Sequence, residues 1–373
     1  MRALYISPHL SATEFGGSLF ASTNLQLLRE AFGGSVTAAS VSRTPHAAAI
    51  AIPSTKNRLG TAVANLQGLC GTLTREGVAH LQRLLISERP SLIWLDTSIL
   101  GTLIPLIRSI VPNAKIVCAF QNVETDLIKQ RLKQRQLQYL PALHATWLNE
   151  RRSARDADLT LALHATDAAR ILTLYGRPID ALLPIIVPDQ MSVDADQPQP
   201  ANAAQPYVLF VGSGSPPNVE ALAFMSRHVA PALRGFRLLA VGSGLGRFGS
   251  SFEHPQLEVR GFVEDLSSVY KGAAAVIAPI FSGGGMKVKI AEALMHGKLV
   301  IASPFAAIGY ESCMEDAICV ARTPIEFSSK INSLIDFGFC KSSRSYFENL
   351  YSYHAGLKHV EKIITSLRRR AVE

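Results

Sequence analysis

The sequence predicts an α/β protein built of two doubly wound, Rossmann-like domains. Short apolar runs alternate with longer segments of helical pattern, as in parallel sheets that are covered by helices. This alternation occurs in two blocks, which a polar, proline-rich segment separates. The chain has 373 residues, of which 48% are hydrophobic, so it contains enough apolar material for two cores.

The first block covers residues 1–188 and has six apolar runs that we expect to form strands. Each run lies next to a segment long enough for a helix, as the connections between parallel strands require. The runs are residues 3–6, 36–40, 92–95, 115–120, 159–163 and 181–185. The stretch Ser91–Pro112 has the length of a membrane span, but Asp96, Pro105 and Arg108 interrupt it, so a buried strand followed by a helix explains it better.

A polar linker, residues 189–206, follows the first block and shows no hydrophobic period. The second block, residues 207–355, again has six apolar runs, at 207–212, 236–242, 257–263, 274–280, 298–303 and 317–321. Residues 356–373 are expected to form a final helix. Because ligands of doubly wound sheets bind at the carboxyl ends of strands, we expect the functional residues in the loops after these runs.

One loop of the second block has the chemistry of an anion site. It places three glycines and two lysines around the start of an expected helix. Glycine lets backbone N–H groups approach an anion closely, and the N-terminal end of a helix attracts negative charge. The residues are Gly283, Gly284, Gly285, Met286, Lys287 and Lys289.

Glu292 lies farther along the same expected helix, where a carboxylate can accept hydrogen bonds from two ribose hydroxyls. We therefore interpret the loop as a site for a diphosphate that carries a sugar and a ribose. An ordinary helix cap with an ion pair between Glu292 and Lys289 is the structural alternative. The spacing from Gly283 to Gly297 fits neither a P-loop nor a dinucleotide-binding fingerprint. Farther upstream, Gly242 and Gly244 are interpreted as glycines that merely end a strand.

The segment from Phe281 to Ser303 resembles the donor site of the retaining GT-B glycosyltransferases of group 1, the family 4-like type, which read approximately GGxxxKxxEAxxxGxPVV. The resemblance extends over nearly the whole chain, since YVLFVGSGSPPNVEAL, FRLLAVGSG and LEVRGFVEDL follow in the family's order. It implies two domains that face each other across a cleft, with the C-terminal helix crossing back to the first. It also implies donor contacts from Gly16, Gly17, Gly212, Ser213, Gly261, Phe262 and Val263.

In the first domain, FQNVETDL resembles an HNVE-type motif of the family, so Gln121 and Glu124 are the candidate catalytic residues. Gln121 stands where such relatives have histidine. A general base is still not required if the diphosphate departs from the front face, because the acceptor's proton then passes to the leaving phosphate.

Two further departures concern the donor domain. Glu292 matches the second glutamate of the family's E-x7-E motif, whereas the first would fall at Gly284 and is absent. The Arg and Lys that many relatives carry after the first donor-domain strand are replaced by SGSPPN. We hypothesise that Lys287 and Lys289 supply the missing positive charge.

A basic segment accounts for much of the net charge of +8. On a helix, Ile128, Leu132 and Tyr139 would form an apolar stripe flanked by Lys129, Arg131, Lys133 and Arg135. Two interpretations fit this pattern. The helix lies on anionic lipid with its cations reaching the headgroups, or it is a solvated face packed on its own core.

The residues and the resemblance together predict a glycosyltransferase that moves a sugar from a nucleoside-diphosphate sugar to an acceptor hydroxyl with retention, in bacterial surface-polysaccharide or glycolipid synthesis. The alternatives are a nucleotide-sugar 2-epimerase and a non-catalytic nucleotide-binding partner. The expected partners are a nucleotide sugar, a saccharide or lipid-linked acceptor and an anionic membrane surface. We expect no cofactor and no required metal, and a cytoplasmic location, at the inner face of the membrane if the basic segment binds lipid.

Other classes of protein fit less well. The five cysteines include no C-x-x-C pair, which argues against a disulfide framework or a zinc site and favours a reducing compartment. Two D-x-D sequences, at Asp156 and Asp158 and at Asp194 and Asp196, do not follow a buried strand as a metal site of GT-A enzymes would. An aromatic content of 7% without a basic-aromatic platform argues against nucleic-acid binding.

Overall fold

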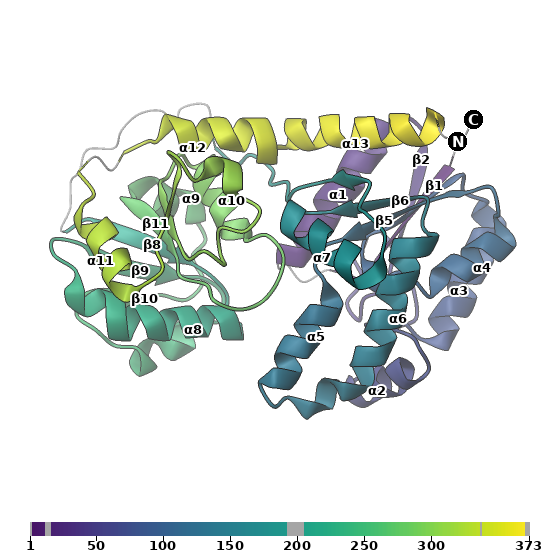
Figure 1. Cartoon of the computed structure of the whole chain (residues 1–373), viewed down its shortest axis with the longest axis horizontal. Coiled ribbons are helices and arrows are strands. Elements are labelled where there is room, and N and C mark those ends of the chain that lie inside the picture. Colours follow the sequence, from purple (N-terminus) through teal and green to yellow (C-terminus); the bar gives the residue numbers. More distant parts are fainter. Residues whose placement is uncertain (1, 12–15, 192–204, 336–337, 370–373) are drawn as a thin grey trace. The chain divides into compact units, whose positions relative to one another are not determined.

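The computed structural model describes residues 2–11, 16–191, 205–335 and 338–369 of the chain (Figure 1). The chain divides into two compact units: unit 1 comprises Met1–Ile186 and Gly356–Glu373, and unit 2 comprises Val187–Ala355. Most of the predicted linker and the aspartates at 194 and 196 lie outside the described residues. Each unit is a parallel sheet with helices around it, so the predicted α/β class is confirmed.

Unit 1 has a seven-stranded sheet in the order β3-β2-β1-β4-β5-β6-β7, with parallel pairing throughout. Its inner strands are nearly continuous apolar runs because a parallel sheet is covered on both faces. The strands are β1 (Arg2–Ser7), β2 (Ser35–Ser40), β3 (Ile50–Ala51), β4 (Leu92–Leu95), β5 (Lys115–Phe120), β6 (Leu159–Ala162) and β7 (Ala181–Leu182). The sequence pattern does not predict β3, which is only two residues long.

Several helices of unit 1 begin at a polar side chain that caps them. Asn57 caps α2, Thr74 caps α3 and His164 caps α7, each accepting a hydrogen bond from a backbone N–H of the first turn. The helices are α1 (Gly16–Phe32), α2 (Arg58–Leu66), α3 (Arg75–Glu88), α4 (Leu103–Ile110), α5 (Glu124–Lys133), α6 (Leu140–Asp156) and α7 (Ala165–Tyr175), with short 3-10 turns η1 (Ser98–Leu100) and η2 (Leu137–Tyr139).

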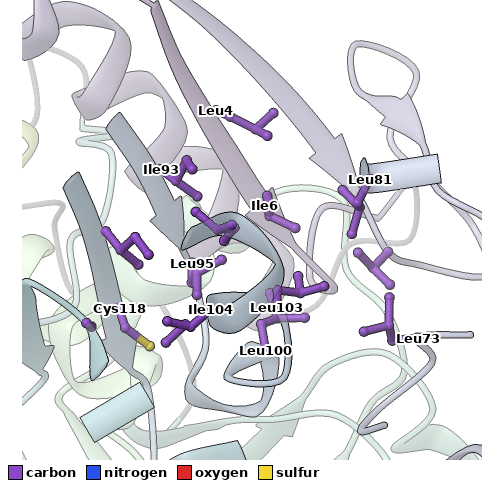
Figure 2. Close-up of a cluster of buried hydrophobic side chains, with 14 of the residues drawn as sticks. Leu4, Ile6, Leu73, Leu81, Ile93, Leu95, Leu100, Leu103, Ile104 and Cys118 are labelled. Carbon is purple, nitrogen blue, oxygen red and sulfur yellow. The ribbon is translucent and has the colours of Figure 1, made fainter. Parts of the chain in front are cut away.

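The hydrophobic core of unit 1 lies between the central strands and the helices that follow them. Figure 2 shows Leu4 and Ile6 of β1 beside Ile93 and Leu95 of β4, with Ile104 of α4 against the same layer. Ser91–Pro112 is thus the strand β4, the turn η1 and the helix α4, as predicted. Among the described residues, no helix has both the length and the apolar character needed to cross a bilayer.

The last helix, α13 (Tyr353–Arg369), returns its residues from Gly356 onward to unit 1. Its side chains Val360, Ile363, Ile364 and Leu367 are buried there. A Cβ atom on Gly356 would lie only 2.7 Å from Ile186, so glycine permits this close packing.

Unit 2 has a six-stranded parallel sheet in the order β10-β9-β8-β11-β12-β13. Its strands are β8 (Tyr207–Val211), β9 (Arg237–Val241), β10 (Leu257–Val259), β11 (Ala275–Ala278), β12 (Val300–Ala302) and β13 (Ile318–Val320), all within predicted runs. Its α-helices are α8 (Pro216–Phe224), α9 (Leu266–Gly272), α10 (Val288–Met295), α11 (Pro324–Asn332) and α12 (Lys341–Tyr346). Shorter helical turns are η4 (Met225–Val229), η5 (Ala230–Ala232), η6 (Gly246–Ser251), η7 (Glu311–Cys313) and η8 (Phe347–Tyr351).

Each sheet has a topological switch point, where the strand order reverses direction. In unit 1 this point lies between β1 and β4, and in unit 2 it lies between β8 and β11. At such a point the loops leaving two neighbouring strands diverge, which opens a crevice at the carboxyl ends of the strands where ligands bind. The topology therefore predicts that ligands bind at the loops that follow these four strands.

Candidate active site

The glycine loop lies at the switch point of unit 2. It follows β11 and leads into α10, while Gly212 and Ser213 follow the neighbouring strand β8. Asn218 of α8 connects the β8 loop with α10, because its amide donates to the Ser213 carbonyl at 3.0 Å and its Oδ1 accepts from Lys289 Nζ at 2.8 Å. The structure thus brings the predicted residues of the β8 and β11 loops together.

The glycine loop has a backbone that only glycine adopts readily. Gly283 has φ +106° and Gly285 has φ +60°. Lys287 is the residue before α10. Its ammonium group donates to the Gly284 carbonyl oxygen at 3.0 Å and to the Gly285 carbonyl oxygen at 2.6 Å. A positive charge, the flexible glycines and the N-terminal end of α10 therefore meet in one place.

Lys289 places its ammonium group 4.1 Å from the ring centre of Phe210, a buried residue of β8. Burial lowers the pKa of Lys289 to about 7, although the nearby carboxylate of Glu292 opposes this shift. This lysine can therefore gain or lose a proton near neutral pH, and an anion placed beside it would favour the charged form.

Glu292 accepts a hydrogen bond from the Tyr270 hydroxyl of α9 at 3.1 Å. Burial raises the pKa of Glu292, and the bond from Tyr270 and the charge of Lys289 oppose this shift. The Tyr270 ring is in turn stacked on His296, with ring centres 4.6 Å apart. Lys289, the residue that would pair with Glu292 in the structural alternative, donates a hydrogen bond to Asn218. Glu292 is therefore held from one side by Tyr270 and keeps further acceptor capacity.

The loops after β8, β9 and β10 pack backbone against backbone. A Cβ atom on Gly242, whose φ is +140°, would lie 1.8 Å from the Gly212 carbonyl oxygen, and the Gly242 N–H donates to the Gly261 carbonyl at 3.0 Å. Gly242 directly follows β9, as interpreted, and its lack of a side chain also lets the β8 loop pack closely against it. Beside Gly261, Phe262 is 74% exposed and Val263 is partly exposed.

Arg247 brings a cation to the loop in which SGSPPN replaces the expected Arg and Lys. Its guanidinium donates to the Gly214 carbonyl at 3.2 Å and lies over the ring of Phe248. Sequence reasoning missed this residue because Arg247 belongs to η6, more than thirty positions further along the chain.

At the switch point of unit 1, a buried carboxylate holds Gln121. The amide of Gln121 donates to the Asp96 carbonyl oxygen at 2.8 Å and to its carboxylate at 3.0 Å, and Ser7 donates to the same carboxylate oxygen at 2.8 Å. Burial raises the pKa of Asp96 to about 6. Because both bonds from Gln121 start at its nitrogen, its side-chain oxygen is directed away from Asp96.

Glu124 is the first residue of α5, and its carboxylate accepts from the Asn122 amide at 3.0 Å. Burial and the charge of Glu150 raise the pKa of Glu124 to about 7. The fully buried Glu150 accepts from the backbone N–H groups of Glu124 and Thr125 at 2.8 and 2.9 Å, so a side chain of α6 caps α5. The candidate catalytic segment is thereby fixed in position.

The remaining predicted residues have simpler surroundings. Gly16 and Gly17 open α1, directly after residues outside the described part. Asp158 accepts from Arg108 and from the Ile116 N–H at 2.7 Å each, a structural role. Within the described ranges, no three His, Cys, Asp or Glu side chains are grouped so as to hold a metal ion.

Asp96, Glu150, Asn218, Tyr270 and Arg247 are the polar contacts that sequence reasoning did not assign. Only Asp96 carries a usable signal, since it directly follows an apolar strand run. The others act through partners that are distant in sequence, so spacing alone does not reveal them.

This fold and site define a class of protein: two doubly wound units, one of which presents a glycine loop and a helix N-terminus at its switch point. Residues 205–336 match the family model described as "Glycosyl transferases group 1". The predicted resemblance is thus confirmed over these residues, and the chain has the predicted GT-B fold.

Solved structures with the same fold cover almost the full chain. HepE of Anabaena in complex with UDP is similar with a TM-score of 0.70 at 13% identity, covering 98% of this chain and 100% of its own. Sucrose-phosphate synthase from Thermosynechococcus elongatus has a TM-score of 0.69 at 14% identity, with 99% of each chain covered. WaaG, a glycosyltransferase involved in lipopolysaccharide biosynthesis, has a TM-score of 0.67 at 16% identity, with 97% of this chain and 99% of its own chain covered. A search of curated protein sequences finds no match.

Proposed function

We propose that this protein is a retaining glycosyltransferase that moves a hexosyl group from a nucleoside-diphosphate sugar to an acceptor hydroxyl. The observation that carries the proposal is the glycine loop at the start of α10, at the switch point of a unit whose sequence matches the group 1 glycosyltransferases. A pyrophosphate is the ligand whose charge and size suit backbone amides, a helix N-terminus and flanking cations.

Each part of the unit 2 site has a role in this proposal. The loop amides and Lys287 bind the diphosphate, Lys289 and Arg247 add charge from the α10 and β9 sides, and Glu292 accepts from the ribose hydroxyls. Arg247 and the two lysines together replace the cations that SGSPPN lacks. The exposed Phe262 and the backbone of Gly261 border the nucleobase. Uridine is the first base to test, because HepE binds UDP and UDP-glucose.

In unit 1, Gln121 and Glu124 are proposed to contact the acceptor. Asp96 holds the Gln121 nitrogen, which leaves the side-chain oxygen to accept a hydrogen bond from the attacking hydroxyl. The bond between the anomeric carbon and the leaving phosphate oxygen breaks, the acceptor oxygen attacks from the same face, and its proton passes to that phosphate oxygen. No external base is needed for this balance, and no metal or cofactor is assigned a step.

The acceptor is proposed to be a saccharide or a lipid-linked hydroxyl used in bacterial surface-polysaccharide or glycolipid synthesis, on the cytoplasmic side of the membrane. Two similar structures support this choice, since WaaG is involved in lipopolysaccharide biosynthesis and WaaB is a lipopolysaccharide outer core galactosyltransferase.

The test is incubation with a panel of uridine and guanosine diphosphate sugars, first by thermal shift and then by product analysis. A bound donor at 100 times its Kd should stabilise the protein by about 2.7 kcal/mol. Slow release of free sugar and nucleoside diphosphate without acceptor supports transfer, whereas an epimerised nucleotide sugar supports the isomerase alternative. Stabilisation by no nucleotide would overturn the proposal, and binding without turnover in the presence of acceptor extracts would favour a non-catalytic partner. Proton NMR of the glycoside product determines whether configuration is retained.

A further inference from the structure

Two helices of unit 1 expose apolar side chains in regular stripes. On α2, Leu59, Val63 and Leu66 are 75%, 48% and 75% exposed, and their spacing puts them on one face of the helix. On α6, Leu140 and Trp147 are 61% and 37% exposed and lie on one face with the exposed His144 between them. Single exposed apolar residues are ordinary, but two such stripes are not.

The two stripes belong to one surface region. Helix α2 packs against α6, and the turn η2 joins α5 to α6 and adds Leu137, which is 70% exposed. Figure 1 shows α2 beside the end of α6 where α5 and α6 are connected. The single helical stripe predicted from Ile128 to Tyr139 does not form, because α5 ends at Lys133, Ile128 is buried and Tyr139 belongs to η2. The apolar face at this region is therefore supplied by α2, η2 and α6, which corrects the expected arrangement.

The segments that carry these stripes, or adjoin them in sequence, are rich in basic residues. Residues 127–149 include Lys129, Arg131, Lys133 and Arg135 but no acidic residue. Lys56 and Arg58 are exposed at the start of α2. The acid closest before this segment in sequence, Asp126, is held by a two-bond pairing with Arg170 at 2.6 and 2.9 Å, although Lys129 also approaches it to 4.0 Å.

Aromatic side chains of this region contact basic side chains. The guanidinium of Arg131 is 4.6 Å from the ring centre of Tyr139, and that of Arg151 is 5.7 Å from the ring centre of Trp147. Amphipathic aromatic rings next to cations are suited to the boundary between headgroups and acyl chains, where one end of the ring is wet and the other apolar.

We propose that α2, η2, the end of α5 and the start of α6 form a membrane face that binds anionic lipid. In this arrangement Leu59, Leu66, Leu137 and Leu140 enter the acyl boundary, while the basic side chains reach the lipid phosphates. Charge complementarity selects this occupant over a second copy of the chain, because a two-fold contact through the same face would place cations against cations. The proposal deepens that of a lipid-linked acceptor, but it requires neither the acceptor nor the transfer reaction.

The test is flotation of the full-length protein with vesicles of phosphatidylcholine alone, or with vesicles that also contain about 30% of the anionic lipid phosphatidylglycerol. We expect binding to the anionic vesicles at low salt and its loss at high salt. In the variant Leu59→Ser/Leu66→Ser/Leu140→Ser, partitioning onto the anionic vesicles should fall by roughly tenfold or more, because less apolar surface is buried in the lipid. Neutralising Lys129, Arg131, Lys133 and Arg135 to glutamine should lower it about fivefold per charge.

A control replaces exposed apolar residues elsewhere, Leu172 of α7 (47% exposed) and Ile325 of α11 (78% exposed), by serine, which should leave binding unchanged. Trp147 reports insertion directly, since the only other tryptophan, Trp94, is fully buried. Its emission should shift to the blue with anionic vesicles and should not shift in Trp147→Phe. Equal binding by the wild type and the leucine variant, or no binding by either, overturns the proposal. A lipid-free dimer that the leucine variant abolishes assigns the face to a second copy instead. UDP affinity should be the same in the wild type and in these variants. Absence of UDP binding in the wild type would count against the proposed function and not against the membrane face.

Discussion

The side chain of Lys289 connects the chemistry of the site with pH. Its ammonium group is partly buried against Phe210, and its pKa falls to about 7, so near pH 8 most of the free protein has this lysine neutral. A diphosphate beside it favours the charged form and raises the pKa again. Binding at pH 8 must then take up a proton, whereas binding at pH 6 need not, because the lysine is already charged.

We predict proton uptake of up to about one per UDP bound at pH 8, from titration calorimetry in buffers of different ionisation enthalpy. Lys289→Met should abolish most of this uptake and weaken binding more at pH 6 than at pH 8. The control Lys341→Met changes an exposed lysine of α12 and should leave the uptake intact. Equal uptake in the wild type and Lys289→Met would exclude a contact between this lysine and the diphosphate.

Glu292 provides a second prediction at the residue scale. Glu292→Gln keeps an acceptor for Tyr270 but removes the charge, so UDP should bind about 10- to 100-fold more weakly, as for a charge-assisted hydrogen bond of 1.5–3 kcal/mol. Inorganic pyrophosphate lacks the ribose and should bind the variant as well as the wild type. A loss that is equal for both ligands would place Glu292 near the phosphates and not at the ribose.

At the scale of elements, the loops of unit 2 depend on glycines whose neighbours leave no room for a side chain. Gly242→Ala should destabilise the protein by about 2–3 kcal/mol, because its Cβ atom would collide with the Gly212 carbonyl in a backbone conformation that alanine disfavours. Gly261→Ala is the matched control: no atom lies within 4 Å of the added Cβ, so its stability should change by less than about 0.5 kcal/mol. Urea unfolding of both variants measures the difference, and similar midpoints would contradict the close packing.

The same elements show what the sequence could and could not predict. Strands such as β4 and β11 are recognisable because burial on both faces makes them continuous apolar runs. The glycine loop was predictable because its glycines and the helix that follows it are local in sequence. Side-chain partners such as Tyr270 and Asn218 were not, since they reach Glu292 and Lys289 only after the sheet has formed. The inward turn of Ile128 likewise depends on what packs beneath α5, which periodicity does not specify.

At the scale of the whole molecule, we expect the final helix to contribute to the stability of unit 1 and not to the proposed donor site of unit 2. Ile364→Ala should therefore cost about 2–4 kcal/mol through the cavity left in a buried position, while the exposed Lys358→Ala should be nearly neutral. Hydrogen exchange should rise in α1, whose Phe32 carbonyl accepts from Arg368 at 2.9 Å, and stay unchanged in α10. UDP affinity should be retained, and its loss would show that α13 also supports unit 2.

The return of α13 also affects how the protein is made. Unit 1 consists of residues 1–186 and 356–373, so the whole of unit 2 is synthesised between its two parts. At about 5–20 residues per second, ribosomes need about 8–34 seconds to complete the intervening 169 residues of Val187–Ala355. During that time the first unit exists without the side chains of Val360, Ile364 and Leu367, and the apolar surface they cover stays open to chaperones or to wrong partners. The second unit, continuous in sequence, can complete its core while the first is still waiting for its last helix.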